Sequence, residues 1–150
     1  MATLKGGNKL VEKLEAFSRS IRTANRVRIG FLSNATYPNG TPVALIALIQ
    51  DSGAPSRGIP PRPFFRNMIA KKKGEWGKAT AALFKANDGD SRKTLEQMGQ
   101  GISGQLKQSI VDTNEPPLAA STIARKGFAK PLVDTGHMLQ SVDYEVVSPT

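Results

Sequence analysis

The chain has 150 residues, with 21 Lys and Arg, 12 Asp and Glu, one His and no Cys, giving a formal net charge of +9. This length predicts a single domain over residues 1–150, and 39% hydrophobic residues suffice for a core, which excludes wholesale disorder. The absence of Cys excludes disulfides, thiolate zinc sites and cysteine nucleophiles, and the single His137 excludes a multi-histidine metal cluster. We therefore expect no metal and no cofactor.

Apolar segments are short throughout the sequence. None approaches the roughly 18 consecutive apolar residues of a membrane span. The first ten residues, MATLKGGNKL, also lack the apolar core of an export signal. We therefore expect a protein that does not contact membranes and is assembled in a cytoplasm.

Positive charge is concentrated in the first half of the chain. Residues 1–73 hold 13 basic side chains against three acidic ones, whereas residues 74–150 hold eight basic against nine acidic. A one-sided basic surface usually meets an acidic partner, such as nucleic acid, an anionic surface or an acidic protein. The alternative is a solvated basic face that only keeps the protein soluble.

The first 32 residues predict a helix followed by a strand. Residues 9–23 carry apolar side chains at spacings of 4, 3 and 4, as on one face of an amphipathic helix: Leu10, Leu14, Phe17 and Ile21. Residues Arg26–Leu32 alternate apolar with polar or small side chains, as in a strand with one buried face: Val27, Ile29 and Phe31. A turn is predicted at Tyr37–Gly40.

A second helix is predicted over Val43–Gln50. Thr41 has the character of an N-cap, with Pro42 at the first helical position. The segment is apolar on nearly every side, so we expect a short, buried helix that ends at Gly53.

A proline-rich segment and two long helices follow. Ala54–Pro63 contains four prolines, which predicts an extended loop. Helical spacing resumes from Phe65 to Leu83, and a further helix, capped by Asp90 or Ser91, continues to about Val111. Three glycines inside that last helix predict a close approach of another helix: Gly99, Gly101 and Gly104.

The final third predicts a loop, a helical turn and a strand. Glu115–Leu118 reads as a loop and Ser121–Arg125 as one helical turn. Residues 130–147 hold a turn followed by a strand with alternating side chains, which we expect to pair with Arg26–Leu32 and set acidic residues opposite basic ones. The predicted fold is α+β, a small antiparallel sheet packed with several helices, plus the proline-rich extended loop.

One string resembles a catalytic motif. Val133–Gly136 reads Val-Asp-Thr-Gly, like the loops that bring two carboxylates together in aspartic proteases. Little chain remains to build a barrel behind it, and the simpler reading is that Asp134 caps a short helix over Thr135–Gln140. His137 has no nearby serine or second ligand, so a structural role is favoured. We expect no enzymatic activity and assign no catalytic residue.

Six basic residues without an intervening acid lie between positions 57 and 73: Arg57, Arg62, Arg66, Lys71, Lys72 and Lys73. Such a cluster suits the phosphates of nucleic acid. Phe64 and Phe65 have the character of core anchors rather than base-stacking platforms, and no recognised nucleic-acid module surrounds them. Nonspecific contact with DNA or with an acidic partner is therefore predicted for Arg57, Arg66, Lys71, Lys72 and Lys73, with a solvated face as the alternative.

Two stretches together resemble a known family. The first, at residues 58–66, reads GIPPRPFFR, and the second, at residues 116–142, ends in PLVDTGHMLQSV. In this order and spacing they resemble the tail-completion and head–tail joining proteins of long-tailed bacteriophages. In that family a "PARPF"-like loop opens a long helix and a "PLIDTGxLxxSI"-like turn precedes the last strand. Lambdoid minor tail proteins and Mu-type virion-morphogenesis proteins look like more distant relatives.

The resemblance implies a structural virion protein without catalytic chemistry. Such proteins form a ring, typically sixfold, at the head-proximal end of the tail, where it joins the head connector. Their location is the tail or neck of the virion, and their partners are further copies and other neck and tail proteins: the connector and the tail terminator or tube. Packaged DNA would pass nonspecifically through the lumen. The alternative function is a nonspecific nucleic-acid-binding module that uses the basic face of residues 1–73.

The resemblance also implies roles for two groups of residues. The first group would contact a neighbouring subunit or the connector: Ile59, Pro60, Pro61, Arg62, Pro63 and Phe64. The second would fix the turn before the last strand: Asp134, Thr135 and Gly136.

Overall fold

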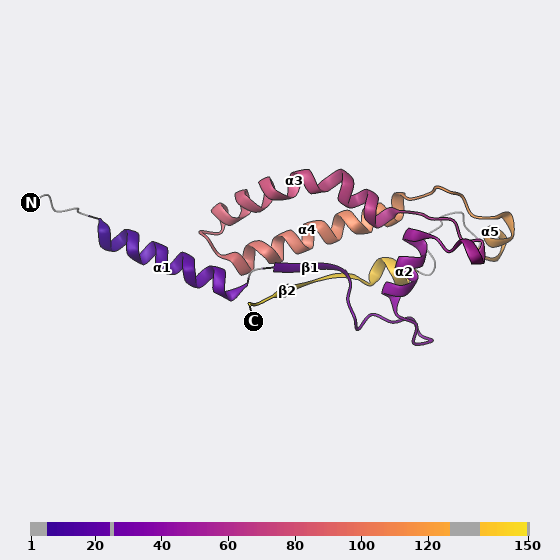
Figure 1. Ribbon diagram of the computed structural model, residues 1–150, viewed down its shortest axis with the longest axis horizontal. Coiled ribbons are helices and arrows are strands. Elements are labelled where there is room, and N and C mark those ends of the chain that lie inside the picture. Colours follow the sequence, from indigo (N-terminus) through magenta and orange to yellow (C-terminus); the bar gives the residue numbers. More distant parts are fainter. Residues whose placement is uncertain (1–5, 25, 127–135, 150) are drawn as a thin grey trace, which may run out of the picture.

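Two long antiparallel helices and a two-stranded sheet make up the body of the protein in the computed structural model (Figure 1). The helices are α3 (Phe64–Ala86) and α4 (Ser91–Asp112), and the strands are β1 (Arg26–Phe31) and β2 (Val142–Val147). Helix α4 is the middle layer, with α3 on one side and both strands on the other. The predicted α+β class, with a small antiparallel sheet, is confirmed.

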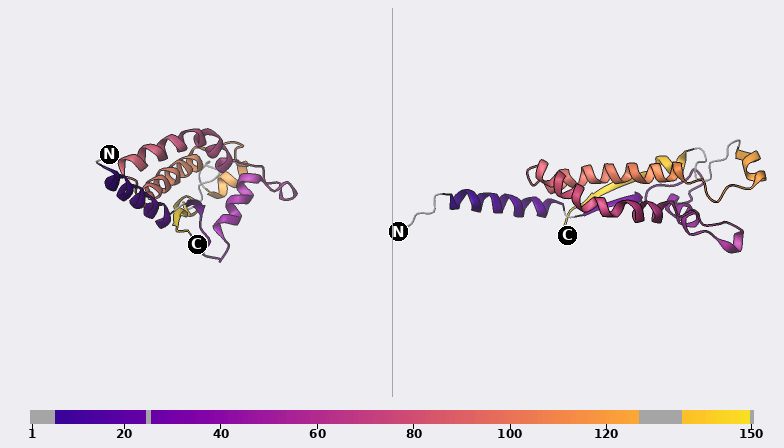
Figure 2. Two further views of the ribbon diagram at one scale, coloured as in Figure 1. Left: turned by 60° about the vertical axis from the view of Figure 1, so that its left-hand side comes forward. Right: turned by 90° about the horizontal axis from the view of Figure 1, so that it is seen from above.

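The remaining helices extend the body at both of its ends. The structure describes residues 6–24, 26–126 and 136–149. Helix α1 (Gly7–Thr23) projects from one end along the long axis, whereas α2 (Val43–Ser52) and α5 (Ala120–Lys126) lie toward the opposite end (Figures 1 and 2). A short 3-10 helix, η1 (Pro55–Arg57), and the single turn α6 (His137–Gln140) lie in the loops. The protein is therefore elongated, with different helices at its two ends.

The two strands pair antiparallel, as the sequence predicts. Ile29 lies opposite Tyr144, and Arg28 lies opposite Glu145, where the two side chains form an ion pair of 3.8 Å between Nη1 and Oε2. Both charged side chains are more than half exposed, so this pair stabilises the sheet by less than about 1 kcal/mol. The predicted placement of an acidic side chain opposite a basic one is confirmed at this position.

The hydrophobic core is built around one face of α4. This face carries apolar side chains at spacings of 3, 4, 4 and 4, which are Leu95, Met98, Ile102, Leu106 and Ile110. Leu95 is half-buried and the others are buried, with Leu106 and Ile110 almost completely inaccessible to solvent. The other buried apolar side chains of this cluster come from α2, α3, α6 and β2: Val43, Ala47, Phe64, Met68, Met138 and Val142. Asp90 begins α4 as predicted, because its carboxylate accepts a hydrogen bond of 3.0 Å from the Lys93 N–H.

Helix α2 departs from its prediction in two ways. Pro42, and not Thr41, occupies the N-cap position, and no side chain caps this helix end by a hydrogen bond. The expectation of a helix buried on all sides is also wrong, because Leu45 and Leu48 are exposed. Among the described elements, α2 packs chiefly against β1 and α3 at the end of the body, and Leu45 and Leu48 lie on its outward face.

The proline-rich loop is more folded than predicted. Ala54 and Ile59 exchange two backbone hydrogen bonds, of 2.8 and 3.1 Å, which close the loop around η1. Gly53 ends α2 with φ 77°, and a Cβ at this position would lie 2.7 Å from the Pro61 nitrogen. The loop therefore returns directly over the end of α2, where the Arg62 N–H donates to the Gln50 oxygen at 2.8 Å, and the expectation of an extended loop is wrong for Ala54–Ile59.

The three glycines of α4 have different environments. A Cβ on Gly99 would lie 2.4 Å from the Cδ2 of Tyr144 in β2, whereas a Cβ on Gly101 or Gly104 would meet no atom within 4 Å. A close approach therefore occurs at Gly99, but it is made by a strand side chain and not by the predicted helix. Among the described residues of this chain, no helix approaches Gly101 or Gly104 closely.

These environments predict opposite effects of the same substitution. Gly99→Ala should lower the free energy of unfolding by about 1–3 kcal/mol, because Tyr144 is contacted near its backbone and cannot move aside easily. Gly101→Ala is the matched control and should raise it by about 0.5–1 kcal/mol, since alanine is the better helix former. Urea denaturation followed by circular dichroism measures both values, and equal effects would contradict the described contact.

Candidate interaction surfaces

A buried arginine joins the proline-rich loop to the segment after α4. Arg62 is 4% exposed. Its guanidinium donates to the backbone oxygens of Pro116 and Pro117, at 3.0 and 3.4 Å, and to the Gln50 Oε1 at 3.4 Å. Burial lowers the pKa of Arg62, but a guanidinium keeps its charge at neutral pH. Three segments distant in sequence are thus held at one end of the protein.

A carboxylate from α2 supports the start of α3. Asp51 is buried, and its Oδ1 accepts hydrogen bonds from the backbone N–H of Phe65 at 2.9 Å and of Arg66 at 3.4 Å. The Arg66 side chain completes the arrangement through its Nε, 2.6 Å from the Asp51 Oδ2. Because Pro63 at the N-cap position provides no side-chain hydrogen bond, Asp51 satisfies first-turn donors of α3 from a neighbouring helix.

The predicted contact segment is only partly available to a neighbour. Phe64 is fully buried in the core and Arg62 is buried at the junction, so the assignment of these two side chains to an outer contact surface is corrected. Apolar packing and the carbonyls of the segment after α4 account for their burial. Pro60 and Pro61 are exposed, and Ile59 and Pro63 are half-buried, which leaves these four residues as the accessible part of the predicted contact segment.

The predicted C-terminal turn is described from Gly136 onward. Asp134 and Thr135 lie outside the described residues, so their role in fixing the turn stays a prediction. The helix begins at His137 with Gly136 at its N-cap and no side-chain cap, so the expected helix over Thr135–Gln140 capped by Asp134 is wrong. Gly136 has a left-handed conformation, φ 73°, and precedes α6. His137 then lies against the loop after β1, with its Nε2 2.8 Å from the Thr36 oxygen and its ring stacked obliquely on Tyr37. This position gives His137 a structural role, as expected.

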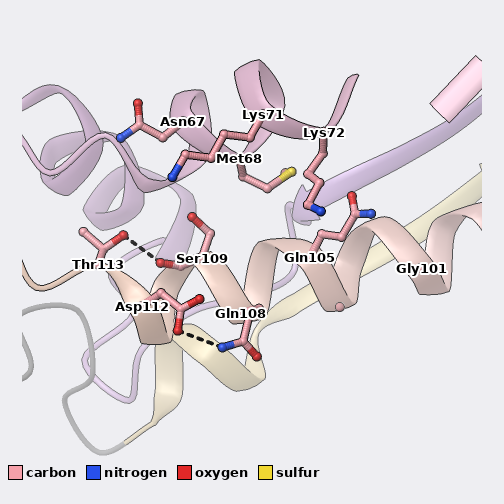
Figure 3. A pocket seen from close by; sticks show the side chains of 11 residues that line it. Asn67, Met68, Lys71, Lys72, Gly101, Gln105, Gln108, Ser109, Asp112 and Thr113 are labelled. Carbon is pink, nitrogen blue, oxygen red and sulfur yellow. Dashed lines mark hydrogen bonds between the residues drawn. The ribbon is translucent and has the colours of Figure 1, made fainter. Parts of the chain in front are cut away.

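The basic cluster is distributed over two surfaces. Arg57 lies on η1, and Arg66 is paired with Asp51. Lys71 and Lys72 instead line a hollow of about 540 Å³ between α3 and α4, shown in Figure 3. The absence of side chains at Gly101 and Gly104 opens this hollow, and Gln105, Gln108 and Asp112 line its α4 side.

The lysines of this hollow are not a simple phosphate site. Lys72 lies 3.7 Å from Glu75, and Asp112 faces the same hollow. These acidic groups lower the local positive potential. Nonspecific contact of Lys71, Lys72 and Lys73 with a phosphate backbone stays a prediction. These three lysines lie on α3 and do not form one continuous basic face with Arg57 and Arg66.

Helix α1 is attached to the body by its C-terminal half. The Ser20 hydroxyl donates to the Gly89 oxygen and accepts from the Ser91 N–H at 2.8 Å, and the Phe17 ring packs edge-on against Phe84, with centroids 5.6 Å apart. The Ser148 hydroxyl also donates to the Thr23 oxygen at 2.9 Å. The earlier turns of α1 extend beyond these contacts, as Figure 2 shows.

The sequence comparisons identify no relative. No protein-family model matches the chain, and neither a curated protein nor a solved structure matches it. Within residues 6–24, 26–126 and 136–149, no group of three His, Asp or Glu residues is arranged to hold a metal ion. No helix in the same ranges combines the length and apolar character needed to cross a membrane.

The buried Arg62 provides a test of the junction. Arg62→Met keeps the apolar stem but removes the donors to the Pro116 and Pro117 oxygens, so it should lower the free energy of unfolding by about 1–3 kcal/mol. Amide hydrogen exchange should also become faster in residues 113–118. Arg57→Met, at an exposed position, is the matched control, with an expected change within about 0.5 kcal/mol. A similar loss in both variants would contradict a specific role for Arg62.

Proposed function

We propose that this protein is a structural component of a bacteriophage neck, which assembles as a ring at the head-proximal end of the tail and joins it to the head connector. The proposal starts from the resemblance of residues 58–66 and 116–142 to tail-completion and head–tail joining proteins. It assigns the protein a role in assembly and no catalytic step.

The observation that carries the proposal is the meeting of these two separate motifs. Arg62 of the first motif donates hydrogen bonds to Pro116 and Pro117 of the second. Phe64 of the first motif shares the hydrophobic core with Met138 and Val142 of the second. Residues more than 50 positions apart thus form one structural unit. This favours the interpretation that both motifs belong to the fold of one family over the interpretation that each motif matches by chance.

The form of this unit is also consistent with an assembly role. The exposed Pro60 and Pro61 lie beside the buried Arg62, so a restrained backbone presents the outer surface of the loop. A restrained segment loses little conformational entropy when it binds a neighbour. This property suits a contact surface between subunits or with the connector.

Electron microscopy of isolated phage tails mixed with the purified protein tests the proposal. We expect added density at the head-proximal end of the tail. Ile59→Asp should reduce this decoration by at least about tenfold, because it places a charge in the loop surface, whereas Arg92→Gln, on exposed α4, should leave it unchanged. Tails that remain undecorated by the folded wild-type protein would contradict the neck role.

The nucleic-acid alternative makes a separate prediction. If Lys71, Lys72 and Lys73 neutralise phosphates, then replacing all three by Gln should reduce the slope of log affinity against log salt by about 2–3 units for duplex DNA. Fluorescence anisotropy over a range of salt concentrations measures this slope. An unchanged slope would remove the three lysines from any DNA contact, and binding to tails but not to DNA would favour the neck role.

A further inference from the structure

The exposed large hydrophobic side chains of the described residues gather on two helices. They are Leu10, Val11, Leu14 and Phe17 on α1, and Leu45 and Leu48 on α2. Their exposures range from 46% for Phe17 to 61% for Leu48. The two helices lie at opposite ends of the long axis (Figures 1 and 2). Single exposed apolar residues are ordinary, but clusters of this kind mark contact surfaces.

Helix α1 lacks internal support for its first turns. It has no side-chain cap at its N-terminus and no acidic residue in its first turn. Its contacts with the body involve Phe17, Ser20 and Thr23, all in its C-terminal half. A helix of this length is marginally stable in water by itself, so a surface that covers Leu10 and Leu14 would stabilise it.

The outer face of α2 has the chemistry to receive such a helix. Leu48 borders a mainly apolar hollow of about 220 Å³, which is lined also by Phe31, Ala47 and Phe65 and by the Asp51–Arg66 ion pair. Helix α2 contains no Lys or Arg, and its Asp51 is already paired with Arg66. An incoming apolar side chain can therefore fill the hollow without burying an unpaired charge of α2.

Charge also favours α2 over α3 as the surface for α1. Four basic side chains and two acidic ones give α1 a net positive charge: Lys9, Lys13, Arg19, Arg22, Glu12 and Glu15. Helix α3 carries six basic side chains and one acidic one: Arg66, Lys71, Lys72, Lys73, Lys78, Lys85 and Glu75. Docking of α1 along α3 would bring like charges together, whereas α2 carries no cation and Arg66, which lines the adjacent hollow, is paired with Asp51.

We propose that α1 of one copy of this chain packs its apolar face against α2 and the adjacent hollow of the next copy. The inference rests on the proposed ring function and specifies the contact between its subunits. Each copy then uses one end as a donor and the other as an acceptor, which is a head-to-tail contact; such contacts form a closed ring where the rotation between copies closes and an open filament where it does not. Pairing of α1 with a second α1 would instead leave Leu45 and Leu48 of both copies uncovered.

The size of the surfaces favours a ring over an isolated pair. Helix α1 has 17 residues and is about 25 Å long. A standard stable interface buries about 800 Å² of surface on each partner, and one face of a helix of this length buries less than that area. A pair of copies forms one such contact, whereas every subunit of a closed ring forms two. Assembly should therefore depend steeply on protein concentration.

Cross-linking between introduced cysteines tests the contact. The natural chain contains no Cys, so Leu14→Cys and Leu48→Cys each introduce a unique thiol at an exposed position. The two variants, carrying tags of different size, are mixed with a short bis-maleimide reagent. We expect a mixed dimer from the mixture, no dimer from either variant alone, and a ladder of larger products from the double variant.

A variant on the opposite face of α1 is the matched control. Glu12 lies on the side of the helix away from Leu14 and is exposed, so Glu12→Cys with Leu48→Cys should give at least about tenfold less mixed dimer. Circular dichroism verifies that each variant is folded. The cross-linking is repeated over a range of protein concentrations up to about 1 mM, at which even a weak complex is substantially formed. If no mixed dimer forms at any of these concentrations, the proposal is overturned.

Other occupants of the α1 face give different outcomes. Dimers from Leu14→Cys alone would overturn the proposal in favour of α1–α1 pairing. The labelling rate of the Leu14→Cys thiol is measured with added phosphatidylglycerol vesicles, which are anionic, and separately with added unlabelled protein. Protection by the vesicles but not by the protein would overturn the proposal in favour of a lipid surface. Mixed cross-links in a protein that never decorates tails would support the contact between α1 and α2 and contradict the neck role. Decoration of tails without mixed cross-links would support the neck role and contradict this contact.

Discussion

The burial of one apolar stripe on α4 is the constraint on which the rest of the structure depends. This helix contacts α3, both strands, α1 and α6, and no other described element has so many neighbours. Leu106 and Ile110 are almost completely inaccessible, so loss of either side chain would leave a cavity that costs about 2–5 kcal/mol. The absence of a side chain at Gly99 lets Tyr144 approach, so the same helix also positions the C-terminal strand. The sheet has only two strands and relies on α4 for its buried face.

Polar contacts, in contrast, organise the end of the protein that carries α2 and the proline-rich loop. Asp51 and Arg62 are both buried, and each is satisfied by backbone groups of a different segment. Their directional bonds hold irregular backbone in one arrangement where few apolar side chains are available. Pro60 and Pro61 are thus held in place by the hydrogen bonds of the neighbouring Arg62, and Pro61 lies against Gly53 at the end of α2. This end is restrained by the chain itself, whereas the first turns of α1 at the other end extend beyond the contacts of that helix with the body.

Local patterns predicted most of the elements, because the α4 stripe, the alternation in β1 and the cap at Asp90 act over a few residues. The sequence could not show which face of α2 is uncovered, because a helix that is apolar all round has no periodic signal to mark its outer side. Arg62 was grouped with the surface cations, because its hydrogen-bond partners lie 54 and 55 residues away. Gly101 and Gly104 look like Gly99 in the sequence and differ only in what β2 and α3 place opposite them.

The direct succession of α1 and β1 has a mechanical consequence. Helix α1 ends at Thr23 and β1 begins at Arg26, so a load on the helix is shared between the first strand and the contacts that Phe17 and Ser20 make with Phe84 and Ser91. Because α1 projects along the long axis, a pull on it slides β1 lengthwise against β2, and the hydrogen bonds of the ladder resist together in shear rather than opening one after another. The bond between Ser148 and Thr23 ties the end of β2 to the same point. A two-stranded sheet that is modest in thermodynamic terms would thus resist a pull along α1.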